Sequence, residues 1–159
     1  MPNWCEGTLK VRGSLEHLKA FVLNALEECG YVGNPPEGPL LDVYEDEQGF
    51  EAKLNRMAYL EGTSRGFVDD DHGYQYFELE NKEGDQILLL RRTQFAWVID
   101  AKELQHLCNK YHVDMKITAF EPGLEFQRDI EIVKGVIVLN TTTKYGDYQW
   151  QCPCPCVGG

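Results

Sequence analysis

Three cysteines near the C-terminus have the spacing that points most directly to chemistry. Cys152, Cys154 and Cys156 alternate with prolines. A proline biases the preceding residue toward an extended backbone. In a flat strand, three thiols at this spacing would share one face, whereas polyproline II would spread them. Zinc sites usually use wider cysteine spacing and need a fourth ligand. We therefore expect a plain Cys-rich tail over residues 151–159, with a zinc site completed by Cys5 as the alternative.

A run of acidic residues, Asp69-Asp70-Asp71-His72, resembles a cluster of ligands for a hard cation. An EF-hand loop places its ligands at alternating positions and ends in a glutamate at position twelve. This run has neither feature. The sequence therefore favours a solvated acidic turn.

No nucleophile paired with a base can be identified. The sequence lacks a Gly-x-Ser-x-Gly elbow, a P-loop and a His-Glu-x-x-His motif. Cys5 precedes Glu6, and nothing nearby in the sequence would lower the pKa of its thiol. We therefore predict that the protein is not an enzyme and, apart from the zinc alternative, that it uses no cofactor.

The charge of the chain is strongly negative and unevenly distributed. Fifteen Lys and Arg against 26 Asp and Glu give a net charge of −11. Residues 1–80 carry 6 basic and 16 acidic side chains, and residues 81–159 carry 9 and 10. Proteins that bind the phosphate backbone have the opposite balance, so direct nucleic-acid binding is disfavoured. An acidic half either attracts a basic partner or simply keeps the protein in solution.

Two amphipathic helices would position these residues. The first is predicted over residues 15–29, after the N-cap Ser14 and before Gly30. The second follows Asp100 and carries an apolar stripe that ends at Tyr111.

Alternating and β-rich segments predict the strands. These lie at residues 3–12, 56–61, 65–68, 74–79, 86–91, 113–120, 125–132, 136–139 and 145–150. The run Ile87-Leu88-Leu89-Leu90 does not alternate, which predicts a strand buried on both faces. Residues 30–49 predict a long acidic loop rich in Pro and Gly, with one short strand near residues 40–44.

The order of these elements predicts a single α+β domain over residues 1–159. Helices with this spacing on an antiparallel sheet favour a split β-α-β arrangement. Two helices would cover one face of a mostly antiparallel sheet, and a C-terminal hairpin would extend the sheet.

The chain resembles a known family at two places. Its opening, Met1-Pro2-Asn3-Trp4-Cys5 followed by a strand that ends in Gly13, is similar to the start of the YubB-like family of phage and plasmid proteins. Residues 97–111, with Glu121-Pro122-Gly123 and Phe126, resemble the C-terminal part of that family. The resemblance implies a ferredoxin-like α+β sandwich and an origin in a mobile genetic element. It supplies no catalytic residues, because the function of the family is unknown.

These observations predict a non-enzymatic factor that binds a basic host or element protein in the bacterial cytoplasm, with no direct contact to nucleic acid or membrane. One form is a counter-defence inhibitor of the anti-CRISPR kind, whose acidic surface occupies a basic groove. The residues expected to form that surface are Glu37, Asp42, Glu45, Asp46, Glu47, Asp69, Asp70 and Asp71. The alternative is a small metal-binding or redox protein that uses Cys152, Cys154 and Cys156. Truncation after Trp150 would remove these thiols and so separate the two hypotheses.

Overall fold

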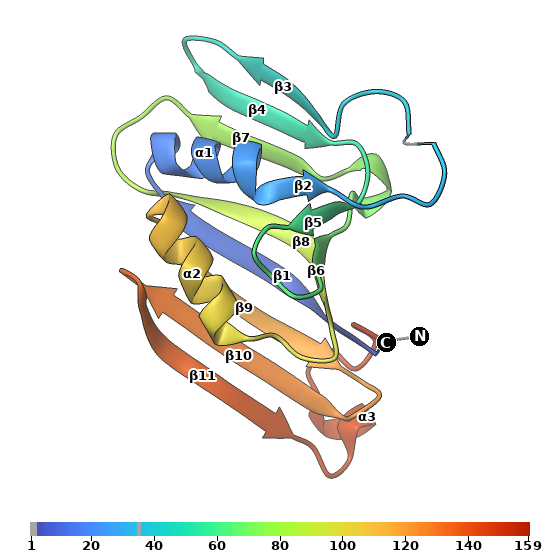
Figure 1. Ribbon diagram of the computed structural model, residues 1–159. Helices are drawn as coiled ribbons and strands as arrows, with labels where there is room; N and C mark the ends of the chain where they lie inside the picture. The colour runs from blue at the N-terminus through green and yellow to red at the C-terminus, as the bar shows by residue number, and fades with distance from the viewer. Residues whose placement is uncertain (1–2, 35) are drawn as a thin grey trace.

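The computed structural model describes residues 3–34 and 36–159. Within them lie eleven strands, three α-helices and one 3-10 turn (Figure 1). The strands are β1 (Trp4–Gly13), β2 (Leu26–Glu28), β3 (Leu41–Glu45), β4 (Gly49–Leu54), β5 (Ala58–Leu60), β6 (Gly66–Val68), β7 (Tyr76–Glu80), β8 (Gln86–Ala96), β9 (Asp114–Glu121), β10 (Phe126–Val133) and β11 (Val136–Lys144). The helical elements are α1 (Leu15–Ala25), η1 (Asp71–Gly73), α2 (Ala101–Tyr111) and α3 (Tyr148–Gln151).

The strands form two sheets in which every described pairing is antiparallel. The large sheet has eight strands in the order β11-β10-β9-β1-β8-β6-β5-β2, and the small sheet has three in the order β3-β4-β7. Strand β1 lies in the middle of the large sheet, where it pairs with β8 on one side and with β9 on the other. Leu9 pairs with Leu90 of β8 and with Ile117 of β9, and all three side chains are buried.

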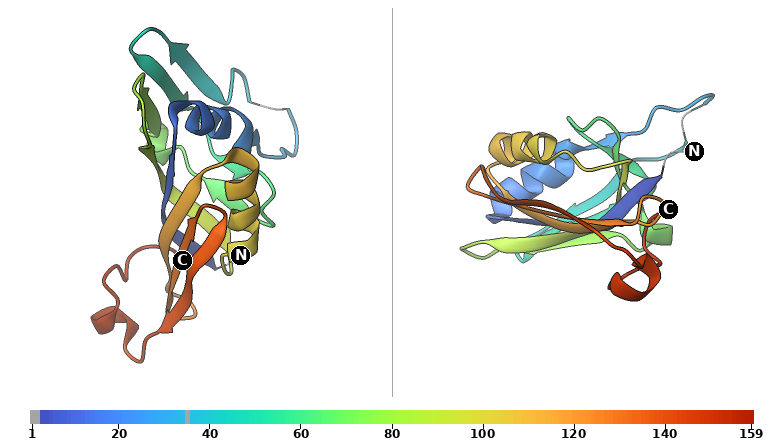
Figure 2. Two further views of the ribbon diagram at one scale, coloured as in Figure 1. Left: turned by 90° about the vertical axis from the view of Figure 1, so that its left-hand side faces the viewer. Right: turned by 90° about the horizontal axis from the view of Figure 1, so that it is seen from below.

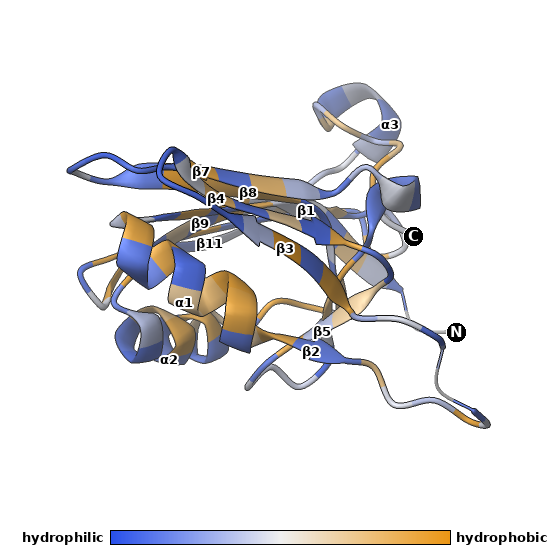
Figure 3. Cartoon of the chain, turned by 90° about the horizontal axis from the view of Figure 1, so that it is seen from above, coloured by the Kyte–Doolittle hydropathy of each residue, from blue (hydrophilic) through white to orange (hydrophobic). Residues whose placement is uncertain are grey.

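Helices α1 and α2 cover one face of the large sheet, and α3 lies on the opposite side (Figures 2 and 3). The apolar stripe of each helix faces the sheet. Phe21 of α1 packs edge-on against Tyr111 of α2, with 5.6 Å between the ring centroids. One continuous core includes both helices and strands of both sheets, so the small sheet is attached to the rest by apolar contacts.

The two predicted helices are present. Both begin after the predicted N-cap residue, and α1 ends earlier than predicted. Ser14 caps α1, as expected, by accepting a hydrogen bond from the backbone N–H of His17 at 3.4 Å. The helix ends at Ala25 rather than at residue 29, because the chain turns into β2 and Leu26 pairs with Leu60 of β5. Asp100 caps α2 by accepting from the backbone N–H of Lys102 at 2.8 Å.

The expectation of a ferredoxin-like sandwich is wrong. The structure has an eight-stranded sheet and a separate three-stranded sheet, and a third helix lies outside the helix pair. Most of the difference arises in residues 30–96. There the short strand predicted near residues 40–44 is present as β3, but it pairs with β4, which was not predicted, in a separate sheet, and β8 continues to Ala96. Isolated short strands have weak local signals, because sheet partners rather than local sequence stabilise them.

Two further strand predictions need correction. Residues 145–150 were expected to form a last strand, but Tyr148–Gln151 is a short helix capped by Asp147, whose carboxylate accepts from the backbone N–H of Trp150 at 3.3 Å. The run at residues 87–90 is not buried on both faces. Ile87 and Leu89 are 59% and 42% exposed, because the face of β8 opposite the helices is open.

One ion pair connects Glu61, the residue after β5, to α2 and makes the stability of the fold depend on pH. Glu61 accepts hydrogen bonds from the ammonium group of Lys110 and, at 2.5 Å, from the hydroxyl of Tyr111. The bond from Lys110, followed by that from Tyr111, lowers the pKa of Glu61 below its ordinary value of 4.5. Stability from a lowered pKa is fully present above the unfolded pKa and is lost as pH falls through the folded one.

We therefore predict that Glu61→Gln destabilises the protein at pH 7 and that its difference from wild type shrinks as the pH falls below 4.5 and through the lowered pKa of Glu61. Urea unfolding of both proteins at pH 7 and pH 3 measures that difference. The control, Glu83→Gln, changes an exposed carboxylate that forms no ion pair among the described residues. A gap between Glu61→Gln and wild type that is the same at both pH values would contradict the prediction.

Candidate functional site

The small sheet has one buried face and one exposed acidic face. On its buried side Phe50, Ala52 and Phe77 join the core. Because side chains alternate along a strand, the residues between them point away from the core. We call this exposed side the acidic face, and it consists of Asp42, Tyr44, Asp46, Glu51, Lys53, Tyr76, Glu78 and Glu80.

The acidic face brings together carboxylates that repel one another. Glu51 of β4 lies directly opposite Glu78 of β7 in the strand register. Like charges at such a position destabilise a sheet. Its five carboxylates are accompanied by Lys53 and, beside Glu80, by Lys82, whose ammonium group lies 2.8 Å from the Glu80 carboxylate. The charge of the face is therefore only partly compensated within the described residues.

Two exposed tyrosines stand among these carboxylates. Tyr44 and Tyr76 are 61% and 54% exposed. The ammonium group of Lys53 lies 5.8 Å from the centroid of the Tyr76 ring. Tyrosine supplies a large, rigid contact area and is enriched at protein interfaces. Carboxylates and tyrosines together form a surface suited to a basic protein.

The structure places only some of the predicted acidic residues on this face. Asp42 lies on it, and Asp46 lies at its end, where its carboxylate accepts from the backbone N–H groups of Gln48 and Gly49 at 2.8 and 3.2 Å. Glu45 points to the other side and forms an ion pair with Lys19 of α1 at 2.5 Å.

Two other predicted residues, Glu37 and Glu47, are exposed beside the small sheet. Glu37 lies in the segment before β3 and Glu47 in the β3–β4 turn. Three further carboxylates, Glu51, Glu78 and Glu80, complete the face and were not among the predicted residues. The alternation in Phe50-Glu51-Ala52-Lys53-Leu54 was the signal that could have identified the first of them.

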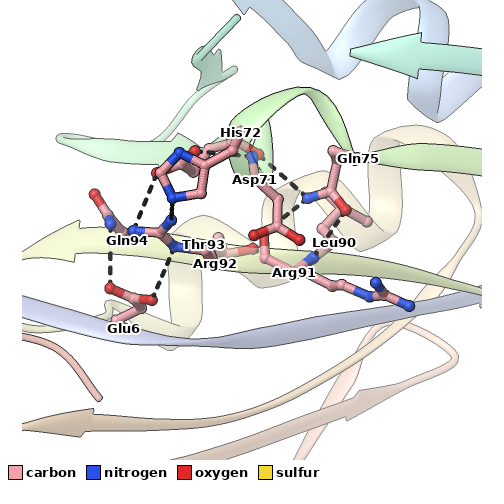
Figure 4. A network of polar contacts seen from close by, with 10 residues as sticks. Glu6, Asp71, His72, Gln75, Leu90, Arg91, Arg92, Thr93 and Gln94 are labelled. Carbon is pink, nitrogen blue, oxygen red and sulfur yellow. Dashed lines mark hydrogen bonds and ion pairs between the residues drawn. The ribbon is translucent and has the colours of Figure 1, made fainter. Parts of the chain in front are cut away.

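The remaining predicted residues, Asp69, Asp70 and Asp71, lie in and before η1 and do not join the acidic face. The Asp69 carboxylate accepts from the backbone N–H of Asp71 at 2.9 Å and lies 3.4 Å from the guanidinium of Arg92. Arg92 also contacts Glu6 at 3.5 Å, and Figure 4 shows this network on β8 and β1. These aspartates therefore anchor a turn, and the acidic residues divide into two separate groups.

The buried side chain of Gln75 holds this turn against β8. Its amide nitrogen donates to the carbonyl oxygens of Asp69 and Arg91 at 3.3 and 2.7 Å, and its amide oxygen accepts from the backbone N–H of Arg91 (Figure 4). Because a buried amide is stable only when its hydrogen bonds are satisfied, the turn has a fixed position on the sheet.

The structure does not gather the four candidate zinc ligands. Cys5 belongs to the main core. Cys152 packs with Phe120 and with Tyr148 of α3 in a second, smaller cluster, and α3 lies on the side of the large sheet away from α1 and α2 (Figure 3). Cys154 and Cys156 are exposed. Within residues 3–34 and 36–159, no three His, Cys, Asp or Glu side chains form a metal-binding group.

Burial keeps the thiol of Cys5 protonated. Burial, followed by the nearby charge of Glu121, raises its pKa to about 12. Because the thiolate is the nucleophile and the metal ligand, Cys5 is poorly suited to either role at neutral pH.

The C-terminal tail also has a packing role. A Cβ on Gly158 would lie 2.5 Å from the carbonyl oxygen of Phe120, so the tail end fits closely against β9. Truncation after Trp150 would remove these contacts as well as the thiols.

No family model, curated protein or solved structure matches the chain. The resemblance to the YubB-like family therefore stays a prediction. None of the described helices has the length and apolar character needed to cross a bilayer.

Proposed function

We propose that this protein is a non-enzymatic binding protein that docks a basic protein onto its acidic face. The observation that carries the proposal is the direct opposition of Glu51 and Glu78 on an exposed sheet surface. The free protein bears the repulsion between them. A partner that supplied Lys or Arg at this position would relieve that repulsion, so the arrangement favours the bound state.

The chemistry of the partner follows from the composition of the face. Carboxylates attract Lys and Arg over several ångströms and raise the rate of encounter. Tyr44 and Tyr76 provide the apolar contact area that such an interface needs at its centre. A nucleic-acid-binding protein has the required basic groove, so occupation of that groove in a counter-defence role is the form of the proposal that we favour.

We predict that replacing carboxylates of the acidic face with neutral amides lowers the affinity for the partner. The variant Asp42→Asn, Glu51→Gln and Glu78→Gln should lose at least about tenfold in affinity, because each exposed charge contributes a few tenths to about 1 kcal/mol. A matched control, Glu16→Gln, Glu27→Gln and Glu125→Gln, removes the same charge from exposed positions elsewhere. Affinity capture from a bacterial lysate, followed by mass spectrometry and titration of the purified partner, provides the measurement.

The proposal is supported if wild type and the control variant bind the same basic partner with equal affinity and the face variant does not retain it. Rising salt should also elute that partner from wild type. A partner that the face variant retains at wild-type affinity would contradict the proposal. Retention of all partners unchanged at about 1 M salt would do the same, because exposed charge pairs are strongly screened there.

A further inference from the structure

A second surface, on the open face of the large sheet, brings together four basic side chains, Lys10, Arg91, Arg92 and Lys116. Strands β1, β8 and β9 form the floor of a groove with a volume of about 540 Å³. The η1 turn contributes Asp71 to its lining and the C-terminal tail contributes Cys154 and Val157. We call it the cationic groove, and its floor includes Thr8, Lys10, Leu89, Arg91, Lys116 and Thr118.

The strand register concentrates positive charge in this groove. Lys10 of β1 lies directly opposite Lys116 of β9, although like charges at such a position cost stability. On the other side of β1, a bulge interrupts the pairing with β8 between Gly7 and Leu9. Arg92 has a positive φ of 50° at this bulge, and both Arg91 and Arg92 line the groove. An irregular backbone thus places two consecutive arginines on one face.

Two of these four cations are not neutralised by the protein. Arg92 contacts Glu6 and Asp69, and Lys116 lies 2.9 Å from the carboxylate of Glu131. Lys10 and Arg91 form no ion pair among the described residues. Figure 4 shows the guanidinium of Arg91 extending away from the network that holds Arg92.

Two carboxylates also line the groove, Glu6 and Asp71. Glu6 contacts Arg92, and the Asp71 carboxylate forms no ion pair in the part of the chain that the structure describes. The ammonium group of Lys10 and the guanidinium of Arg91 are therefore the cationic groups that remain available to an anion in this groove.

We infer that the cationic groove binds a small phosphomonoester that has an apolar or planar body. A phosphomonoester carries nearly two negative charges and three acceptor oxygens at neutral pH, which matches one free ammonium group and one free guanidinium. Leu89 is 42% exposed and, with Phe120 and Val157, provides apolar surface for the remainder of the ligand. The volume lies within the range of small-molecule sites.

The surroundings favour a small ligand over a nucleic acid. Single-stranded nucleic acid requires a long basic track with stacking platforms. Here η1 and the tail flank the groove. Along β8 from the floor, Ile87 adjoins Glu51, Glu78 and Glu80 of the acidic face, which would repel a continuing phosphate backbone. The inference is independent of the proposed protein partner, because it uses a different set of residues.

Calorimetric titration of the full chain with adenosine 5′-monophosphate, adenosine and inorganic phosphate tests this inference. The monophosphate should bind at least about tenfold more tightly than adenosine, since each charge-assisted contact contributes at least that factor. Lys10→Gln and Arg91→Gln should each weaken the monophosphate about tenfold. Lys102→Gln, on the first turn of α2 and exposed, is the matched control and should leave the affinity unchanged.

Backbone amide shifts of wild-type protein give a second measurement that needs no variant. Added monophosphate should shift the amides of Lys10, Arg91 and Lys116 and leave those of α2 unchanged. The inference is overturned if the monophosphate does not bind at millimolar concentration, or if adenosine binds equally well. Retention of wild-type affinity by both groove variants, or affinity that appears only with single-stranded RNA and rises with its length, would also overturn it.

Discussion

Phe77→Ala is expected to lower the free energy of unfolding by about 3–5 kcal/mol, the usual cost of deleting a fully buried aromatic ring. Phe77 is 1% exposed, lies on the inner face of β7 and belongs to the core that joins the small sheet to α1. Its loss leaves a cavity where the two sheets meet. Denaturant unfolding, monitored by circular dichroism, gives the measurement.

The adjacent residue supplies the matched control for this prediction. Tyr76 lies on the same strand but faces solvent on the acidic face. Tyr76→Ala should change stability by about 0.5 kcal/mol or less and should instead weaken the proposed protein partner. Equal destabilisation by the two substitutions would show that the small sheet is not oriented as described.

Gly7→Ala is the second substitution with a large expected effect, about 3 kcal/mol or more, which is the upper range for overpacking. A Cβ on Gly7 would lie 2.3 Å from the carbonyl oxygen of Thr118 and 2.9 Å from the Cα of Ala119. Both contacts are with the backbone of β9, so no side-chain rotation relieves them. Strand β1 lies between β8 and β9, and a shift there would disturb both pairings and the floor of the cationic groove.

Gly30→Ala is the control for the glycine prediction. No heavy atom lies within 4 Å of the Cβ position at Gly30. Alanine there should be neutral or stabilise by up to about 1 kcal/mol, through the reduced entropy of the unfolded chain. Thermal unfolding of both variants measures the contrast. A melting temperature of Gly7→Ala at or above that of Gly30→Ala would contradict the close approach of β1 and β9.

The acidic face and the cationic groove are two different surfaces of the same molecule. Along β8, Ile87 lies beside the acidic face and is 59% exposed, and Leu89, two residues further on, lines the cationic groove. The net charge of −11 therefore does not show where basic side chains gather. Local fields act over about one Debye length, roughly 8 Å at physiological salt.

Local signals in the sequence were sufficient for the starts of α1 and α2 and for the buried side of β1. Ser14 and Asp100 are N-caps whose side chains accept the first free N–H groups, and capping involves only neighbouring residues. The alternation in β1 marks its buried side in the same way, because strand periodicity is a property of the segment itself. These features determined where α1 and α2 begin and which side of β1 is buried.

The excess of carboxylates in the first eighty residues was also evident from the sequence, but its arrangement was not. Asp42 and Asp69 appear equivalent in the sequence, yet one lies on the acidic face and the other forms an ion pair with Arg92. The predicted acidic residues lie close together in the sequence, whereas Glu51 and Glu78 are far apart in it and meet only because β4 pairs with β7. Long-range pairing depends on register and twist, which local sequence does not specify.

The cationic groove was decided by tertiary structure alone. Lys10, Arg91 and Lys116 are separated by up to 106 positions in the chain. No local sequence pattern distinguishes any of them from other basic residues. The antiparallel register of three strands and one bulge brings them onto the same face. The sequence by itself therefore determined where the two long helices begin, which side of β1 is buried and how much charge the chain carries. The folded sheet decided which charges meet, because contact between distant residues requires the whole set of strand pairings.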